Sequence, residues 1–125
     1  MLGSSHADQL IDEIWDKLPG NVQLPESWED FVAQTGPTSA HMDDKRRFPR
    51  YHLRGKAVLE LEGVYLAVYA KDLSRSGLAF YCEKQLFPCQ EVGIWLGSGP
   101  RGVVKITRCR RVQERCYECG AEFEK

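Results

Sequence analysis

The fold of this chain is decided by the stretch HLRGKAVLELEGVYLAVYA, residues 52–70 of 125. Two runs rich in Val, Leu and Tyr, residues 52–62 and 64–70, are separated by Gly63. Apolar and polar residues alternate roughly in the first run, as they do in a strand with one buried face. A glycine between two such runs indicates a turn. The stretch therefore predicts two paired strands.

The residues that follow repeat this pattern of short strands divided by turn signals. We expect further strands at residues 78–82, 91–96, 103–112 and 116–123. Phe87-Pro88 breaks the chain before the second of these, and the GSGP sequence at 97–100 is a strong turn signal after it. Six short strands of this kind are typical of a small barrel. The sequence predicts a mainly β protein, with a six-stranded antiparallel β-barrel in a domain spanning residues 41–125.

The residues before the barrel predict two helices. Residues 6–18 place apolar side chains at helical spacing, with Trp15 among them, and Pro19-Gly20 ends the segment. A second short helix is predicted from residue 25 or 26 to residue 35, with Trp28 on its apolar stripe. Each stripe indicates packing against the rest of the protein, with docking of a partner as the alternative. We expect residues 1–40 to form an acidic helical N-terminal extension, and we hypothesise that its helices cover the mouth of the barrel.

Formal charge is divided unevenly along the chain, although the whole chain sums to −1. Residues 1–44 hold nine acidic residues and one basic residue, a net charge of −8, whereas residues 45–125 carry +7. Such asymmetry indicates an anionic ligand for the basic part. The N-terminus lacks a basic region followed by an apolar stretch, and the apolar runs are too short to cross a bilayer. We therefore expect a cytoplasmic protein without membrane insertion.

Residue types that carry catalysis form no recognisable constellation in this sequence. The three histidines, His6, His41 and His52, have no cysteine or serine partner at a familiar spacing. A Gly-rich phosphate loop, an HExxH motif and a GxSxG motif are also missing. The sequence therefore favours a binding protein over an enzyme, and no cofactor is expected.

The five cysteines include one CxxC pair, Cys116 and Cys119. An odd cysteine number without a secretory signal argues against a disulfide framework. A structural zinc site needs further ligands at short spacing, and Cys109 with Cys82 or Cys89 would have to supply them across unusual gaps. We interpret the cysteines as ordinary reduced thiols, with zinc binding as the alternative, and expect no metal site.

Two local clusters carry the functional signal. The first is the basic run KRRFPR at 45–50, and the second is DLSRSG at 72–77. Alone, the first would be a solvated or non-specific anion-binding run. Alone, the second would be a turn, with Gly77 allowing positive φ. Together, and in this order, they resemble the PilZ domain family, in which RxxxR precedes the barrel and (D/N)xSxxG follows the second strand. The resemblance runs from about Lys45 to Phe123, and the matching residues are Arg46 and Arg50 with Arg47 as an extra cation, and Asp72, Ser74 and Gly77.

The resemblance implies a receptor for cyclic di-GMP in which these six residues hold the ligand. Arginine can donate two parallel hydrogen bonds to guanine or phosphate and can stack on the base. The resemblance also implies that Asp72 accepts hydrogen bonds from the edge of a guanine and that Ser74 donates a hydrogen bond to a phosphate or base. Gly77 would permit close approach of the ligand. We expect ligand binding to change the conformation of the chain and so to signal to a downstream protein partner.

Two alternatives remain at this level. One is a PilZ-like barrel that acts only through protein contacts, without a ligand. The other is a single-stranded nucleic-acid binding barrel, which needs aromatic residues on a strand face for base stacking, with Tyr65, Tyr69 and Phe80 as candidates. No nucleic acid is expected as a partner under the preferred interpretation.

Overall fold

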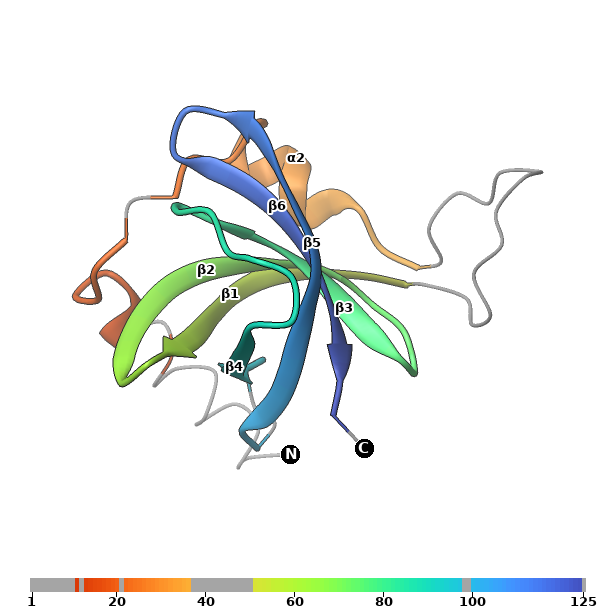
Figure 1. Cartoon of the computed structure of the whole chain (residues 1–125). Coiled ribbons are helices and arrows are strands. Elements are labelled where there is room, and N and C mark those ends of the chain that lie inside the picture. Colours follow the sequence, from red (N-terminus) through yellow and green to blue (C-terminus); the bar gives the residue numbers. More distant parts are fainter. Residues whose placement is uncertain (1–10, 12, 21, 37–50, 98–99, 125) are drawn as a thin grey trace.

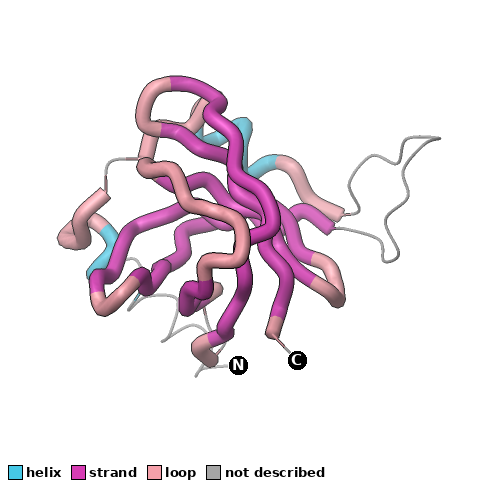
Figure 2. Tube along the Cα trace, viewed as in Figure 1, coloured by secondary structure: helices cyan, strands magenta, loops and turns pink. Residues whose placement is uncertain are grey.

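The computed structural model describes residues 11, 13–20, 22–36, 51–97 and 100–124. Within these ranges, six antiparallel strands close into a barrel in the order β1-β2-β3-β6-β5-β4 (Figures 1 and 2). The strands are β1 (Tyr51–Leu61), β2 (Val64–Leu73), β3 (Gly77–Cys82), β4 (Glu91–Trp95), β5 (Gly102–Gln113) and β6 (Cys116–Phe123). The predicted six-stranded antiparallel barrel is confirmed. No helix in the described ranges is long and apolar enough to cross a membrane.

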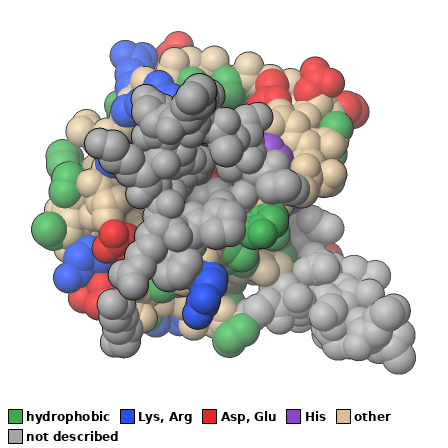
Figure 3. Space-filling view, turned by 90° about the vertical axis from the view of Figure 1, so that its right-hand side faces the viewer, with side chains coloured by type: hydrophobic (Ala, Val, Ile, Leu, Met, Phe, Trp, Pro, Cys, Tyr) green, Lys and Arg blue, Asp and Glu red, His purple; other side chains and the backbone are tan. Residues whose placement is uncertain are grey.

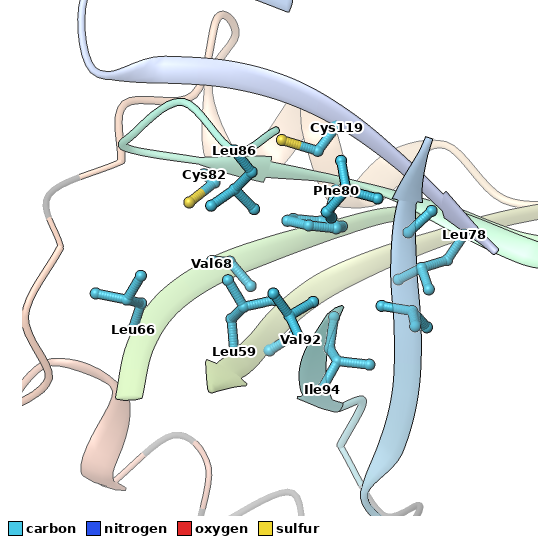
Figure 4. Packing of buried hydrophobic residues seen from close by; sticks show 14 of the residues in the cluster. Leu59, Leu66, Val68, Leu78, Phe80, Cys82, Leu86, Val92, Ile94 and Cys119 are labelled. Atoms are coloured by element: carbon cyan, nitrogen blue, oxygen red, sulfur yellow. The ribbon is translucent and has the colours of Figure 1, made fainter. Parts of the chain in front are cut away.

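Apolar side chains from all six strands fill the interior of the barrel (Figure 4). Alternate residues point inward because the side-chain period of a strand is two. Phe80 and Leu59 are completely buried, and Ile94 and Ile106 are 1% exposed. Burial of one such side chain stabilises the fold by about 1.5–3 kcal/mol, so this interior supplies the main stabilisation of the barrel.

Strand β2 is longer than the predicted 64–70 because a β-bulge interrupts its alternation without ending its pairing. The register between β2 and β3 shifts between Ala70 and Asp72. Ala70 lies in the interior cluster, whereas Asp72 pairs with Ala79, whose neighbours Leu78 and Phe80 face the interior. Asp72 therefore lies on the outer face at the end of β2, and not in the following turn as the sequence suggested.

Both helices before the barrel end earlier than predicted. The first helix has its described helical residues at 11 and 13–15, so it ends before residue 18. The second, α2 (Trp28–Ala33), has Ser27 as its N-cap, whose Oγ accepts a hydrogen bond from Asp30 N at 3.1 Å. It ends at Gln34, where the backbone becomes extended. The chain can then reach β1, where His52 N donates to Gly36 O at 2.8 Å.

The described residues of the N-terminal extension pack on the outer wall of the barrel, whereas our hypothesis placed the helices over the mouth; residues 1–10, 12, 21 and 37–40 lie outside the described residues. The indole N–H of Trp15 donates to Ala57 O at 3.1 Å and Val68 O at 3.0 Å, two carbonyls on the paired strands β1 and β2. Phe31 of α2 is fully buried against the outward-facing rings of Tyr69 and Tyr81. We call this second cluster the covered wall; its buried members are Val22, Phe31, Tyr81 and Cys116, with Trp15, Leu24, Val32, Tyr69 and Val112 around them.

Candidate functional site

The structure brings three of the predicted site residues to one end of the barrel. Asp72 ends the outer face of β2, Ser74 lies in the turn after it, and Gly77 begins β3. Figure 1 shows that the beginning of β1 reaches the same end as the beginning of β3. The other predicted residues, Arg46, Arg47 and Arg50, lie outside the described residues.

Ser74 holds the turn together. Its Oγ lies 3.3 Å from the backbone nitrogens of Ser76 and Gly77 and accepts hydrogen bonds from both. Its own backbone N donates to Gly77 O at 2.8 Å. A side chain that satisfies successive backbone donors in this way stabilises one turn conformation. Ser74 therefore shapes the loop beside Asp72, whatever else it contacts.

Gly77 is required for a reason that differs from the one predicted. Its φ is not positive, so backbone freedom does not explain the glycine. Instead, a Cβ atom at Gly77 would lie 2.1 Å from Ala121 O on β6. A side chain there would push β6 away from β3 and open the sheet. The close approach that the glycine permits is therefore between two strands of the barrel.

One row of residues crosses the outer face from β1 to β5, and we call it the outer rung. Register pairs join His52 to Asp72, Asp72 to Ala79, Ala79 to Gly120, and Gly120 to Arg108. The two central residues, Ala79 and Gly120, have a methyl group and no side chain, respectively. The carboxylate of Asp72 and the imidazole of His52 lie at one end of the row, and the guanidinium of Arg108 lies at the other. Ala79 is only 1% exposed, so the centre of the rung is buried.

Arg108 is one of the groups that cover the centre of the rung. A Cβ atom at Gly120 would lie 2.9 Å from Arg108 Nε and 3.1 Å from its Cγ, so the arginine side chain lies across the glycine. The Arg108 side chain is 55% exposed. It can therefore swing away from Gly120 without crossing packed core, and its guanidinium is accessible to a ligand.

Three cations surround a buried carboxylate next to the outer rung. Glu118 forms an ion pair and hydrogen bond with Lys71, and its Oε1 lies 2.8 Å from Arg110 Nη2 and 4.0 Å from Arg108 Nη1. Burial alone would raise the pKa of Glu118, but the hydrogen bonds and charges of Lys71 and then Arg110 outweigh it and lower the pKa below 4.5. One ionised carboxylate against three cations leaves this part of the face positive.

His52 connects the outer rung with the N-terminal extension. Its Nδ1 lies 3.1 Å from Arg54 Nη2, which also donates to Gln34 Oε1 at 3.2 Å. Burial, and then the charge of Arg54, lower the pKa of His52 below 6.5, so the ring is neutral at pH 7. A movement of His52 can therefore be transmitted to Gln34 of the extension through the Arg54 side chain alone.

Arg54 is held mainly by packing and charge. Its guanidinium carbon lies 4.7 Å from the centre of the Phe31 ring, and its Nη1 lies 3.5 Å from Glu26 Oε2. The side chain is only 5% exposed, and Nε and Nη1 have no hydrogen-bond partner among the described residues. A buried N–H donor without a hydrogen-bond partner costs free energy. A small movement of the Arg54 side chain that gave these donors partners would remove that cost.

The CxxC cysteines lie on opposite sides of β6. Cys116 belongs to the covered wall, whereas Cys119 belongs to the interior cluster. Two residues three apart on a strand face opposite ways, so these thiols cannot bind the same metal ion. The part of the chain that the structure describes contains no group of three or more His, Cys, Asp or Glu side chains able to hold a metal.

Sequence reasoning did not include Arg108, Gly120 and Ala79 in the site. The two motifs that carry the functional signal, at residues 45–50 and 72–77, contain none of these residues. Arg108 lies on β5, far from both motifs in the sequence. Its position opposite Gly120 follows from a register shift between Ile106 and Arg108, which no periodic pattern in the sequence indicates.

The barrel matches a known protein family. The family model of the PilZ domain matches residues 44–125, which include every strand of the barrel. None of the curated proteins compared with the chain matches it. The matched part covers well over half of the chain and contains both motifs. The chain therefore belongs to the PilZ domain family, whose members are generally non-catalytic receptors for cyclic di-GMP.

Proposed function

We propose that this protein binds cyclic di-GMP along the outer rung and transmits binding to its N-terminal extension. The observation that carries the proposal is the rung itself, because it joins a motif residue, Asp72, to Arg108 across two small residues. Guanine is planar and needs room between the groups that recognise its edges. Ala79 and Gly120 provide the smallest side chains at the centre of the rung, once Arg108 has moved.

Both ends of the rung suit a guanine nucleotide. The Asp72 carboxylate can accept from guanine N1–H and from its exocyclic amine, which a phosphate alone would not require. The Arg108 guanidinium can donate to guanine O6 and N7 or to a phosphate, and its plane can stack on the base. The positive surroundings of Glu118 add attraction for the two phosphates.

The family motif assigns the remaining cations, Arg46, Arg47 and Arg50, to the same ligand. They belong to residues 37–50, whose two flanking residues, Gly36 and Tyr51, are held beside the rung. His52 N donates to Gly36 O, and Tyr51 pairs with Leu73, next to Asp72. Figure 3 views the molecule from this side, and charged side chains of both signs lie around the rim of the face.

The effect of ligand binding would reach a partner through the contact between His52 and Arg54. A ligand that contacts Asp72 and His52 would alter the position of Arg54, which packs on Phe31 and contacts Gln34. Weakened packing there would loosen α2 from the covered wall. A ligand shifts such an equilibrium only by its different affinity for the two states. The downstream protein partner would then recognise the released extension or the exposed wall.

The single-stranded nucleic-acid alternative loses most of its stacking residues. Phe80 is fully buried inside the barrel. Tyr69 packs under Trp15, Trp28 and Phe31. Of the three candidate aromatics, Tyr65 alone is exposed, and a platform for successive bases needs more than one such ring.

Calorimetric titration with cyclic di-GMP tests the proposal. Wild type should release or absorb heat to saturation, and Asp72→Ala and Arg50→Ala should each weaken binding about tenfold to a hundredfold, as expected for loss of a bidentate contact. Glu91→Ala removes an exposed carboxylate on β4 and should leave the affinity unchanged. Absence of binding by the wild type would refute the proposal. Binding of a single-stranded oligonucleotide with a steep salt dependence would favour the alternative.

A further inference from the structure

Two thiols oppose each other directly on β5 and β6. Cys109 pairs in register with Cys119, and their Sγ atoms are 3.3 Å apart. Both contact the interior cluster near Leu86, and Figure 4 shows Cys119, Leu86 and Cys82 gathered at one end of the core. Neither thiol takes part in the proposed ligand site.

The backbone geometry at this pair is compatible with a disulfide. Cα atoms of paired antiparallel residues lie about 4.5–5.5 Å apart, within the range of about 4.4–6.8 Å seen for disulfides. The sulfurs would have to approach from 3.3 Å to a bond length of about 2 Å. Side-chain rotation and a small tightening of the ladder are sufficient for this movement.

The two sulfurs differ in solvent exposure and in hydrogen bonding. Cys109 is half-buried, whereas Cys119 is fully buried. Cys109 Sγ accepts hydrogen bonds from Leu86 N at 3.4 Å and from the Cys119 thiol at 3.3 Å. Burial, and then the contact with Cys109, raise the pKa of Cys119, which keeps its proton until it reacts.

We propose that Cys109 and Cys119 form a reversible oxidation site in which a peroxide converts the dithiol into an intrachain disulfide. In the first step Cys109 Sγ attacks the peroxide oxygen and becomes a sulfenic acid, and with hydrogen peroxide one water leaves. In the second step Cys119 Sγ attacks Cys109 Sγ, the new S–S bond forms, and the hydroxyl group leaves with the Cys119 proton as a second water. A dithiol reductant reverses the change and restores both thiols.

The other cysteines are less suited to this reaction. Cys116 lies on the opposite face of β6 in the covered wall. Cys89 is exposed, in the segment between β3 and β4. Cys82 is buried near the pair, but β3 does not pair with β5, and the register partner of Cys82 on β6 is Tyr117 and not Cys119. The register therefore selects Cys109 with Cys119.

The test is oxidation of the folded wild-type chain with hydrogen peroxide, followed by alkylation and digestion with trypsin and a glutamyl endoprotease. Trypsin isolates residues 109–110, and cleavage after Glu118 separates Cys116 from Cys119. We expect a cross-linked peptide that joins residues 109–110 to residues 119–122, two hydrogens lighter than the sum of its parts. Dithiothreitol should remove it.

Two variants and the pattern of products keep the result interpretable. Cys89→Ser should leave the cross-link unchanged, whereas Cys109→Ser should abolish it while circular dichroism shows a folded barrel. A cross-link from Cys82, or Cys109 oxidised to sulfinic acid without any cross-link, would overturn the assignment. Recovery of unmodified Cys109 and Cys119 after Cys89 has been oxidised would also overturn it.

Discussion

The covered wall and the outer rung occupy the same face of the same sheet, yet their side chains differ in size and charge. The covered wall presents the bulky rings of Tyr69 and Tyr81, closed over by Phe31. The rung presents Ala79 and Gly120, with charged groups at its ends. Bulky neutral rings bury area and stabilise the fold, whereas small residues leave contact area for a ligand. Side-chain size thus divides one surface into a stabilising part and a recognition part.

Glu118 and its cations form the boundary between these two parts. Lys71 pairs with Glu118 and lies over the Tyr81 ring of the covered wall, with 5.6 Å between Nζ and the ring centre. Burial, and then the charge of Glu118, raise the pKa of Tyr81 to about 12, so this ring stays neutral. On the other side, Arg108 reaches from Glu118 to the rung. Four variants test the division, in order of decreasing expected effect.

The largest effect is expected from Phe31→Ala, which empties the centre of the covered wall. Removal of a fully buried phenylalanine side chain costs about 3–5 kcal/mol of unfolding free energy. Urea unfolding followed by circular dichroism measures the loss. Val64→Ala removes an exposed apolar side chain from β2 and should change the free energy by less than about 0.5 kcal/mol. Equal losses in the two variants would show that the extension does not stabilise the barrel.

Gly77→Ala is expected to destabilise the end of the barrel that carries the rung. The added Cβ would meet Ala121 O, and overpacking against backbone typically costs about 1–3 kcal/mol. Thermal unfolding should show a lower midpoint for this variant. Gly55→Ala is the matched control, because no atom lies within 4 Å of its built Cβ and its φ is not positive. An unchanged midpoint for Gly77→Ala would contradict the close approach of β3 and β6.

Arg108→Ala should weaken cyclic di-GMP binding with little change in stability. Loss of one bidentate arginine contact costs about 1–3 kcal/mol of binding free energy. Calorimetry measures the affinity and urea unfolding measures the stability. Arg111→Ala is the control, because Arg111 pairs with Tyr117, which packs against the interior cluster, and so lies on the other face of the sheet. Equal effects of both variants would mean that general positive charge, and not the rung, attracts the ligand.

The smallest effect is expected from Glu118→Gln, and it depends on pH. The pKa of Glu118 is lowered in the folded state, so its ionised form stabilises the fold above the unfolded value of 4.5. This contribution should disappear as the pH falls below 4.5 and through the folded-state pKa. The Arg110 and Arg108 side chains are largely exposed, and solvent weakens their share. Wild type and variant should therefore differ in stability at pH 7 and converge in acid. A difference that grows toward low pH would contradict the lowered pKa.

The fold could be predicted because the alternation of buried and exposed residues in strands, and the residues that form turns, are local patterns visible in the sequence. The alternation in residues 52–61 and the turn at Gly63, whose φ is +83°, identified the first hairpin correctly. The end of β2 was misplaced because a bulge at Lys71 breaks the alternation while pairing continues to Leu73. The second helix ends before the predicted residue 35 because Gln34 is extended and because Gln34 and Gly36 accept hydrogen bonds from Arg54 and His52 of β1.

The candidate site could be predicted only where a contiguous motif carries it. Asp72, Ser74 and Gly77 form such a motif, and all three lie together at one end of the barrel. The opposite end of the rung could not be predicted, because Gly120 and Arg108 meet Ala79 only after β3 pairs with β6 and β6 with β5. The long-range strand order and the register shift between Ile106 and Arg108 decide that contact, and local periodicity in the sequence indicates neither.

The measurement that tests the central claim most directly is the change of backbone amide chemical shifts during titration with cyclic di-GMP. The account predicts saturable shifts at Ala79 and Gly120, in the middle of the rung, with Asp72 shifting as well. The contacting pair of exposed Tyr65 and half-buried Trp95, on the part of the barrel formed by β1, β2 and β4, should stay unchanged. Saturable shifts confined to Tyr65 and Trp95, with none at Ala79 and Gly120, would contradict the account.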